Sequence, residues 1–289
     1  GFSPDPITFS CILKACAGMG DIEKGKEIHD EIVKHNLLER NVVLATALVE
    51  MYVKFNMLAK AEQVLDELPV GDAMIWNVLI AGYIEQGQSQ EALDCFQRMQ
   101  EEGLSPNIVS YIYILKACGS IVSIKKGEQI HDEIVNRGLP EKENALGTAL
   151  VDMYAKCGAL DKAQKVLEEL PARNMVSWSA LIAGYAQQGH VSEALNCFEQ
   201  MESEGVSPDD VTFLCVLNAC SHSGQLDEAQ MLFKNMSGKY RITLNFEHQT
   251  CMVMVLGCAG NFESAMSLIK VMPCDYTSGW LALLAACRK

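Results

Sequence analysis

Trp76-Asn-Val-Leu-Ile-Ala-Gly-Tyr83 returns, little changed, as Trp178-Ser-Ala-Leu-Ile-Ala-Gly-Tyr185, 102 positions further along the chain. Over the longer stretches 73–107 and 175–209, 18 of 35 aligned positions carry the same residue. In each octapeptide the Trp, Leu, Ile and Tyr are spaced i, i+3, i+4 and i+7, which is the spacing of one apolar helix face. The chain is therefore built from helical repeats, and this property decides its fold class.

The 102-residue cycle divides into segments of 31 to 36 residues, each with two helical patterns. In 73–107 the first pattern stops at Gly87, and the second stops at Gly103. Glycine is the residue at which helices most often end. The predicted segments are 6–41 (long), 42–72 (short), 73–107 (P-type), 108–143 (long), 144–174 (short), 175–209 (P-type), 210–245 (long) and 246–276 (degenerate short), followed by a partial, E-like segment at 277–289.

A single helix–turn–helix segment cannot bury its apolar faces alone, so neighbouring segments must stack. No strand-like alternation of apolar and polar residues appears along the chain. We therefore predict an all-α fold, a right-handed α-α superhelical solenoid of helix-turn-helix repeats. The first helices are expected to line the concave side and the second helices the convex side.

The charge balance argues against a nucleic-acid binder. Of the 289 residues, 23 are Lys or Arg and 37 are Asp or Glu, for a net charge of −14. Nucleic-acid-binding proteins usually present a basic surface to the phosphates. Many of the carboxylates fall in second-helix patterns, and these are expected on the convex, solvated face: Glu23, Glu27, Asp30, Glu31, Glu168 and Glu169.

The 12 cysteines lie inside apolar helical patterns and are interpreted as small buried residues in a reducing compartment. No apolar stretch reaches the roughly 18 residues that a membrane-spanning helix needs. Gly1–Pro6 resembles a turn and not a secretory signal. Since the chain begins and ends inside patterned sequence, we expect a fragment from which a targeting segment is missing.

Further motifs identify a repeat family. Glu102-Gly-Leu-Ser-Pro-Asn107 and Glu204-Gly-Val-Ser-Pro-Asp209 close the two P-type segments. With the two octapeptides, they resemble the pentatricopeptide repeat family and depart from the Trp-x2-Leu-Gly-x2-Tyr pattern of tetratricopeptide repeats. The alternating lengths resemble the P-L-S subclass. Ile114-Leu-Lys-Ala-Cys118 together with Gly127-x-x-Ile-His131 resembles the family's long unit. Thr148–Gly158 resembles its short unit, and Trp280–Cys287 resembles the start of its E motif.

The resemblance implies a protein that binds single-stranded RNA in a mitochondrion or chloroplast, reads about one base per repeat, and is not itself an enzyme. P-L-S members typically specify sites of C-to-U RNA editing. A deaminase domain or editing cofactors acting in trans would then be partners. The resemblance implies no cofactor or metal, no membrane and no small-molecule substrate.

In this family the fifth and last residues of a unit read one base. An Asp carboxylate only accepts hydrogen bonds and suits guanine, whereas an Asn amide also donates and suits adenine or a pyrimidine. The expected base-reading residues are Ser10, Asn41, Thr46, Asp72, Asn77, Asn107, Thr148, Asn174, Ser179, Asp209 and Thr250. The second residue of a unit wedges between bases, and Lys at the thirteenth position of a short unit faces phosphate. The expected wedges are Val43, Met74, Ala145 and Val176, and the expected phosphate ligands are Lys54 and Lys156.

In this chain, the fifth and last residues of each segment together predict G for 42–72, C or U for 73–107, A for 144–174 and G for 175–209. The segment 6–41 nominally suits A. The array would run parallel to the RNA, with its N-terminus at the 5′ end, over a core of G, pyrimidine, any base, A and G.

Three positions depart from the base-reading pattern. Ile112 and Leu214 stand at the fifth position of long segments and cannot hydrogen-bond a base, so these segments are interpreted as spacers. Tyr276 stands at the last position of 246–276, where a polar residue is expected.

His29-Asp30-Glu31 and His131-Asp132-Glu133 match the H-x-E of zinc deaminases, but the partner P-C-x-x-C is absent from the sequence. We interpret both as repeat framework. Two alternative functions stay open: a protein-binding scaffold like a tetratricopeptide array, which the acidic balance favours, and RNA binding in splicing or stability.

Overall fold

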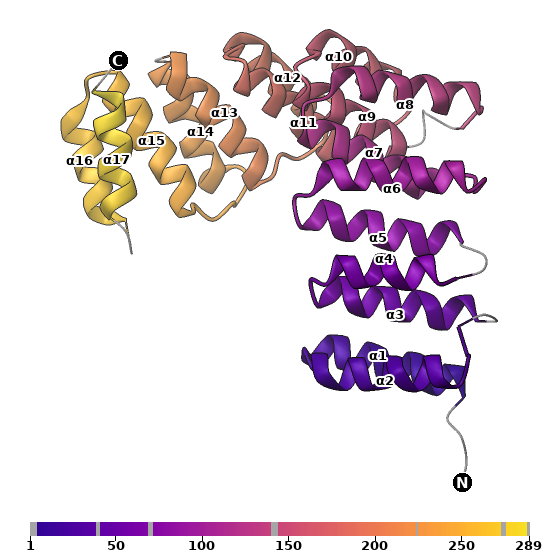
Figure 1. Ribbon diagram of the computed structural model, residues 1–289. Coiled ribbons are helices and arrows are strands. Elements are labelled where there is room, and N and C mark those ends of the chain that lie inside the picture. Colours follow the sequence, from indigo (N-terminus) through magenta and orange to yellow (C-terminus); the bar gives the residue numbers. More distant parts are fainter. Residues whose placement is uncertain are drawn as a thin grey trace. The chain divides into compact units, whose positions relative to one another are not determined.

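The computed structural model describes residues 5–38, 41–68, 72–139, 144–223, 225–272 and 276–287. The chain forms two compact units, Gly1–Glu141 and Lys142–Lys289. The described part of the first unit consists of α1 (Pro6–Met19), α2 (Ile22–Lys34), α3 (Val42–Lys54), α4 (Leu58–Asp66), α5 (Ala73–Glu85), α6 (Ser89–Glu101), α7 (Ile108–Ser120) and α8 (Ile124–Asn136) (Figure 1). That of the second consists of α9 (Asn144–Lys156), α10 (Leu160–Glu169), α11 (Met175–Gln187), α12 (Val191–Ser203), α13 (Asp210–Ser223), α14 (Leu226–Gly238), α15 (Phe246–Cys258), α16 (Phe262–Val271) and α17 (Tyr276–Ala286).

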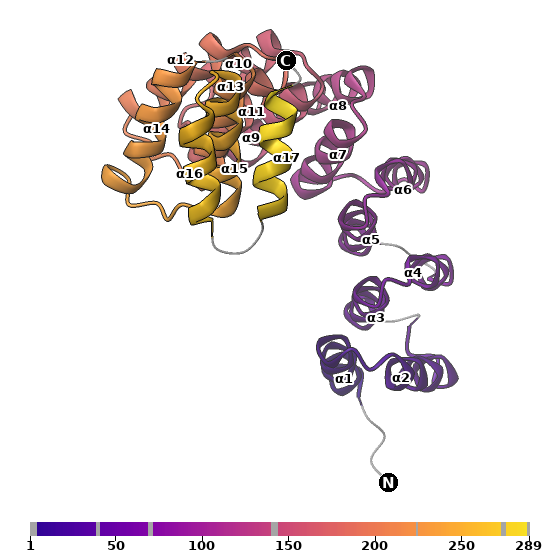
Figure 2. The ribbon, with the colours of Figure 1, turned by 90° about the vertical axis from the view of Figure 1, so that its left-hand side faces the viewer.

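Within each unit the helices form stacked hairpins. In the first unit α3 packs on α1, α5 on α3, and α7 on α5, while each second helix packs on the first helix of its own hairpin. Figure 2 shows α1, α3 and α5 end-on in one layer, with α2, α4 and α6 in a second layer beside them. The second unit has the same order, with α9, α11, α13, α15 and α17 packed in succession. The predicted all-α solenoid of helical hairpins is confirmed, and no strand occurs among the described residues.

The repeated octapeptide forms the packing surface between neighbouring first helices. Trp76 and Trp178 are 0% and 2% exposed. A Cβ added at Gly82 would lie 2.6 Å from Val53 Cγ1, and one at Gly184 would lie 2.9 Å from Ala155 Cβ. Since real Cβ atoms do not approach this closely, glycine is the residue that lets each first helix lie directly against the preceding one.

The hairpin turns also follow from glycine. Gly87 and Gly103, predicted as helix ends, have φ angles of 73° and 79°. Side-chain-bearing residues rarely adopt such left-handed angles, and glycine does so without steric cost.

The cysteine prediction is only partly confirmed. No disulfide joins the described cysteines, and several of them, such as Cys118 and Cys220, are buried. The expectation is wrong for Cys11 and Cys287, which are exposed. Cys11 lines an open hollow of α1 and Cys287 follows the end of α17, so neither is covered by a neighbouring hairpin. Cys274 lies outside the described residues.

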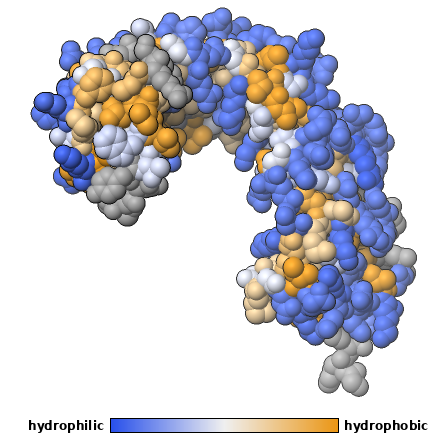
Figure 3. Space-filling model, turned by 60° about the vertical axis from the view of Figure 1, so that its left-hand side comes forward, coloured by the Kyte–Doolittle hydropathy of each residue, from blue (hydrophilic) through white to orange (hydrophobic). Residues whose placement is uncertain are grey.

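Hydrophilic side chains cover most of the face in Figure 3, with separate apolar patches between them. The six second-helix carboxylates predicted on the solvated face, from Glu23 to Glu169, are all exposed. No described helix is both long enough and apolar enough to cross a membrane.

Candidate nucleic-acid interface

The two predicted reading positions occupy two fixed places in each hairpin. The fifth residues stand one turn into the first helices, as Thr46 does in α3 and Thr148 in α9. The last residues stand immediately before the next first helix, as Asn107 does before α7. The side chains of Glu143 and Tyr276, the last residues of 108–143 and 246–276, lie outside the described residues.

The last residues are N-caps, a role that sequence reasoning missed. Asn41 Oδ1 accepts a hydrogen bond from the Leu44 N–H at 3.0 Å, and Asn107 Oδ1 accepts one from the Ser110 N–H at 3.0 Å. A side-chain oxygen at this place satisfies an N–H that the helix itself leaves unpaired. The same contact is made by Asp72 to Met74, Asn174 to Ser177, Asp209 to Thr212, and Asn245 to His248. Capping by itself accounts for Asn and Asp at these positions, so their polarity alone does not distinguish an RNA binder from a scaffold.

The distinguishing observation is that fifth and last residues meet. Asn77 Nδ2 donates to Asn107 Oδ1 at 3.2 Å, although 30 residues separate them. Asn174 Nδ2 donates to Thr148 Oγ1 at 3.4 Å across 26 residues. Each of these two pairs therefore forms one polar group at the junction of two first helices.

The pair Ser179 and Asp209 is joined through a third residue. Ser179 Oγ lies 2.6 Å from Thr212 Oγ1, and Thr212 Oγ1 donates to Asp209 Oδ1 at 2.6 Å. Thr212 was not predicted to belong to the site. A hydroxyl residue three positions after an Asn or Asp, as in Asp209-Asp-Val-Thr212, was the available signal.

The remaining fifth residues bond to their own helix. Ser10 Oγ, Thr46 Oγ1 and Thr250 Oγ1 each donate to the carbonyl four residues earlier, at 2.9, 2.8 and 2.9 Å. No hydrogen bond joins Thr46 to Asp72, or Ser10 to Asn41, among the described residues, so these two pairs are not held together as the other three are.

Exposed apolar side chains occupy the second positions of most segments. The predicted wedges Val43, Met74 and Val176 are 71%, 60% and 56% exposed. Ala145 is also exposed but presents only a methyl group. The second residues of the long segments, which were not predicted as wedges, are Ile7, Val109 and Val211, and they are exposed as well. They were missed because the long segments were interpreted as spacers.

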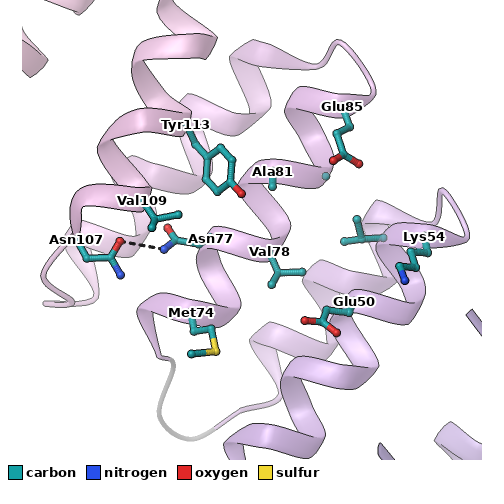
Figure 4. Close-up of a pocket in the computed structure, with 12 residues that line it drawn as sticks. Glu50, Lys54, Met74, Asn77, Val78, Ala81, Glu85, Asn107, Val109 and Tyr113 are labelled. Carbon is teal, nitrogen blue, oxygen red and sulfur yellow. Dashed lines mark hydrogen bonds between the residues drawn. The ribbon is translucent and has the colours of Figure 1, made fainter. Parts of the chain in front are cut away.

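Wedges and polar pair together form a slot. A hollow of about 560 Å³ opens over α3, α5 and α7, with Met74 and Val109 on two sides and the bonded pair Asn77 and Asn107 between them (Figure 4). Its rim carries Lys54. Two apolar side chains facing each other across amide groups are suited to a flat, hydrogen-bonding ring.

Comparable hollows lie elsewhere on the first helices. One of about 300 Å³ is lined by Ser10 and Asn41, with Ile7 and Val43 as its apolar sides and Lys14 nearby. In the second unit, Leu214 and Thr250 line a hollow of about 290 Å³. In that hollow the wedge position is taken by Glu247. An acidic residue there is unsuited to packing on a base.

The two predicted phosphate ligands differ in their surroundings. The Lys54 ammonium makes no ion pair within the described residues, whereas Lys156 Nζ lies 2.7 Å from Asp152 Oδ2. Lys156 is therefore partly neutralised before any phosphate arrives. Lys14 and Lys116, four residues after the fifth positions of their long segments, are exposed and add positive charge that sequence reasoning did not assign to the site.

The thiols near the hollow in the second unit have low reactivity. Burial raises the pKa of the Cys215 and Cys251 thiols to about 11. A thiol with such a pKa is protonated at neutral pH and is a poor nucleophile or metal ligand.

The first H-x-E motif belongs to the packing between hairpins. His29 Nδ1 is hydrogen-bonded to the Tyr52 hydroxyl at 2.7 Å, and the two rings meet edge to face. Burial lowers the pKa of His29 and raises that of Tyr52 to about 12. No group of three or more His, Cys, Asp or Glu residues in the described ranges could hold a metal ion.

Comparison with known proteins places this geometry in a family. The family model described as "PPR repeat family" matches residues 71–120 and 173–222. The model described as "PPR repeat" matches residues 7–37, 148–175, 211–240 and 250–275.

Relatives from Arabidopsis thaliana align along almost all of the chain. The pentatricopeptide repeat-containing protein At3g28640 is 38% identical over 99% of this chain and 57% of its own length. The mitochondrial protein At1g06140 is 35% identical over all of this chain and 52% of its own. The chloroplastic protein At1g08070 is 38% identical over 99% of this chain and 39% of its own. The chain thus spans about half the length of the curated relatives it matches.

A solved structure shows the same fold. The crystal structure of the pentatricopeptide repeat protein PPR10 in complex with an 18-nt psaJ RNA element superposes with a TM-score of 0.77 at 21% identity, covering 99% of this chain and 41% of that one. Because two models of one repeat family match along the sequence and relatives of that family align with nearly all of it, the chain belongs to the pentatricopeptide repeat family.

Proposed function

We propose that this chain binds single-stranded RNA sequence-specifically and reads about one base per hairpin. The observation that carries the proposal is the slot over α3, α5 and α7. There Asn77 and Asn107 are bonded to each other between the exposed side chains of Met74 and Val109. The RNA bound by PPR10 in its crystal structure supports the same ligand class for this chain.

The slot has the chemistry that an unstacked base requires. Apolar wedges on both sides replace the stacking partners that the base loses in a single strand. The polar pair between them supplies hydrogen bonds to the base edge. Because the second, fifth and last residues recur at the same places in successive hairpins, successive slots along the first helices would take successive nucleotides.

Hydrogen bonding within the pair limits what Asn77 and Asn107 offer to a base. Asn107 Oδ1 accepts from both the N–H and the hydroxyl of Ser110 and from Asn77 Nδ2. Asn107 Nδ2 remains as a donor, and Asn77 Oδ1 is a buried acceptor that has no partner among the described residues. A mixed donor and acceptor pair suits the edge of C or U.

The other pairs keep the preferences that their chemistry suggests. Thr46 with Asp72 and Ser179 with Asp209 would favour G, and Thr148 with Asn174 would favour A. The RNA core is then G, pyrimidine, any base, A and G, read from the N-terminal hairpins onward.

The acidic surface makes affinity modest and does not abolish binding. Most exposed carboxylates lie on second helices, whereas Lys14, Lys54 and Lys116 lie on the first helices together with the exposed carboxylates of Glu85, Asp210 and Glu247. Few phosphate contacts mean weak electrostatic steering and a shallow salt dependence. A protein-binding scaffold, which the net charge of −14 favours, has no need for bonded polar pairs between exposed apolar side chains.

We assign the array a binding role that directs an RNA-processing event, with C-to-U editing as the first candidate. The alternating segment lengths and the E-like segment at 277–289 support editing. The catalytic deaminase would lie outside residues 1–289 or act in trans. Splicing or RNA stability is the alternative outcome, and the names of the relatives favour a mitochondrial or chloroplast location.

Fluorescence anisotropy tests the proposal directly. A labelled RNA that carries the predicted core is titrated at low salt beside a scrambled RNA of identical composition. We expect the core RNA to bind at least tenfold more tightly, since each mismatched base in a specific site costs about 1–3 kcal/mol. Equal binding of both RNAs would overturn sequence specificity. A pull-down that recovers protein and no RNA would support the scaffold.

A further inference from the structure

Thr212 joins the two reading residues of segment 175–209. Its side chain is completely buried, and its hydroxyl lies 2.6 Å from both Ser179 Oγ and Asp209 Oδ1. Its backbone N–H also donates to Asp209 Oδ1 at 2.8 Å. One residue of the following hairpin thus contacts both members of the pair.

The direction of each hydrogen bond follows from counting hydrogens. A carboxylate has no hydrogen to give, so the single hydroxyl hydrogen of Thr212 is donated to Asp209 Oδ1. The bond between Ser179 and Thr212 must then be donated by Ser179. As a result Ser179 keeps its lone pairs, and Asp209 keeps its second oxygen, Oδ2, as acceptors for a base.

We infer that Thr212 is a specificity-determining positioning residue for the nucleotide that faces Ser179 and Asp209. It fixes both side chains as hydrogen-bond acceptors at one relative position. Two fixed acceptors match the N–H donors on the Watson–Crick edge of guanine and offer no donor to the ring nitrogen of adenine. This inference rests on the proposed RNA-reading function and adds a residue that belongs to neither the fifth nor the last position.

The chain contains an internal comparison for this inference. Thr46 and Asp72 form a pair of the same chemical type, but the residue that corresponds to Thr212 is Ile75, which has no hydroxyl. No hydrogen bond joins Thr46 to Asp72 within the described residues. The pair with Thr212 should therefore discriminate guanine from adenine more strongly than the pair without it.

The test compares Thr212→Val with Thr212→Ser in the full 289-residue chain. Binding is measured by anisotropy with RNAs that carry G or A at the nucleotide facing Ser179 and Asp209. We expect Thr212→Val to lower the G-to-A affinity ratio at this nucleotide about tenfold, as for the loss of one hydrogen bond to a charged group. Thr212→Ser retains the hydroxyl and should retain most of the ratio.

Controls separate a local effect of Thr212 on base selection from a general loss of folding. The G-to-A ratio at the nucleotide facing Thr46 and Asp72 should be unchanged in every Thr212 variant. A general loss of folding would alter both ratios and the melting curve. If Thr212→Val does not refold, Thr212→Ala removes the same hydroxyl without inserting a methyl group at hydrogen-bonding distance, and it must give the same loss.

Two outcomes distinguish a failure of the proposed RNA-reading function from a failure of the role assigned to Thr212. Wild-type protein that shows no base preference at any position would overturn the proposed function itself. Wild-type protein that prefers G, with an unchanged ratio in folded Thr212→Val or Thr212→Ala, would overturn the role of Thr212 alone.

Discussion

Replacing Asp209 with Asn should change which base the segment 175–209 selects while leaving its fold intact. Asp209 Oδ1 accepts bonds from the N–H and the hydroxyl of Thr212 at 2.8 and 2.6 Å. An Asn carbonyl oxygen can accept both of these bonds, so the N-cap of α13 is kept. The other carboxylate oxygen, which is left for the base, becomes an amide nitrogen that donates.

The expected change in affinity follows from this single atom. Guanine loses one hydrogen bond to a charged acceptor. In its place, the N–H of the new Asn amide is opposed to an N–H of the guanine edge. We expect a loss of about 2 kcal/mol for G, or about 30-fold in affinity, together with a gain for A. Removal of one negative charge strengthens binding to every RNA equally and cancels in the ratio of the two affinities.

The assay is an anisotropy titration of Asp209→Asn and wild type with two RNAs that differ only by G or A at this nucleotide. Asp72→Asn is the matched control, because it should shift the preference at a different nucleotide and leave this one unchanged. Asp209→Ala should lower stability as well, by about 1 kcal/mol, because it removes the cap. The reasoning is refuted if Asp209→Asn leaves the G-to-A ratio unchanged or alters it equally at both nucleotides.

Four other changes probe the packing, the wedges and the charges. Gly184→Ala should lower the melting temperature by more than Gly82→Ala in thermal denaturation, since the added Cβ meets an Ala155 side chain that cannot rotate away; a stabilised Gly184→Ala would contradict this. Ser110→Ala should lower the free energy of unfolding by about 1 kcal/mol in urea titrations through loss of the capping box, and an unchanged value would show that the box is dispensable. Met74→Ala should weaken binding about tenfold whichever base is present, through lost apolar contact, and a loss confined to one base would contradict a wedge. Lys54→Gln should reduce the slope of log affinity against log salt by about 0.7, whereas an unaltered slope would remove Lys54 from the phosphate contacts.

Helices and hairpins were predictable because the apolar spacing in Trp76–Tyr83 is set by local geometry. The convergence of Asn77 with Asn107 was expected from the family resemblance. Its reason became visible only in the structure, where the N-cap of α7 lies beside the first turn of α5. This contact joins residues 30 positions apart and depends on how two helices pack, a property that no local pattern encodes.

Other parts of the site were hidden for related reasons. An Asn before a helix has the same sequence signature whether it caps the helix, reads a base or does both. Thr212 belongs to one hairpin and acts on the pair of the preceding one, so a search confined to single segments passes over it. Ile7 and Val109 were overlooked because the long segments were interpreted as spacers.

The claim that successive hairpins meet successive nucleotides is tested most directly by photo-crosslinking. A single 4-thiouridine is moved one nucleotide at a time through the RNA core, and the crosslinked peptide is identified by mass spectrometry. The account predicts that each one-nucleotide step toward the 3′ end moves the crosslink to the first helix of the next hairpin, for example from around Val43 to around Met74. Crosslinks that stay on one peptide, or that fall on the second helices, would contradict it.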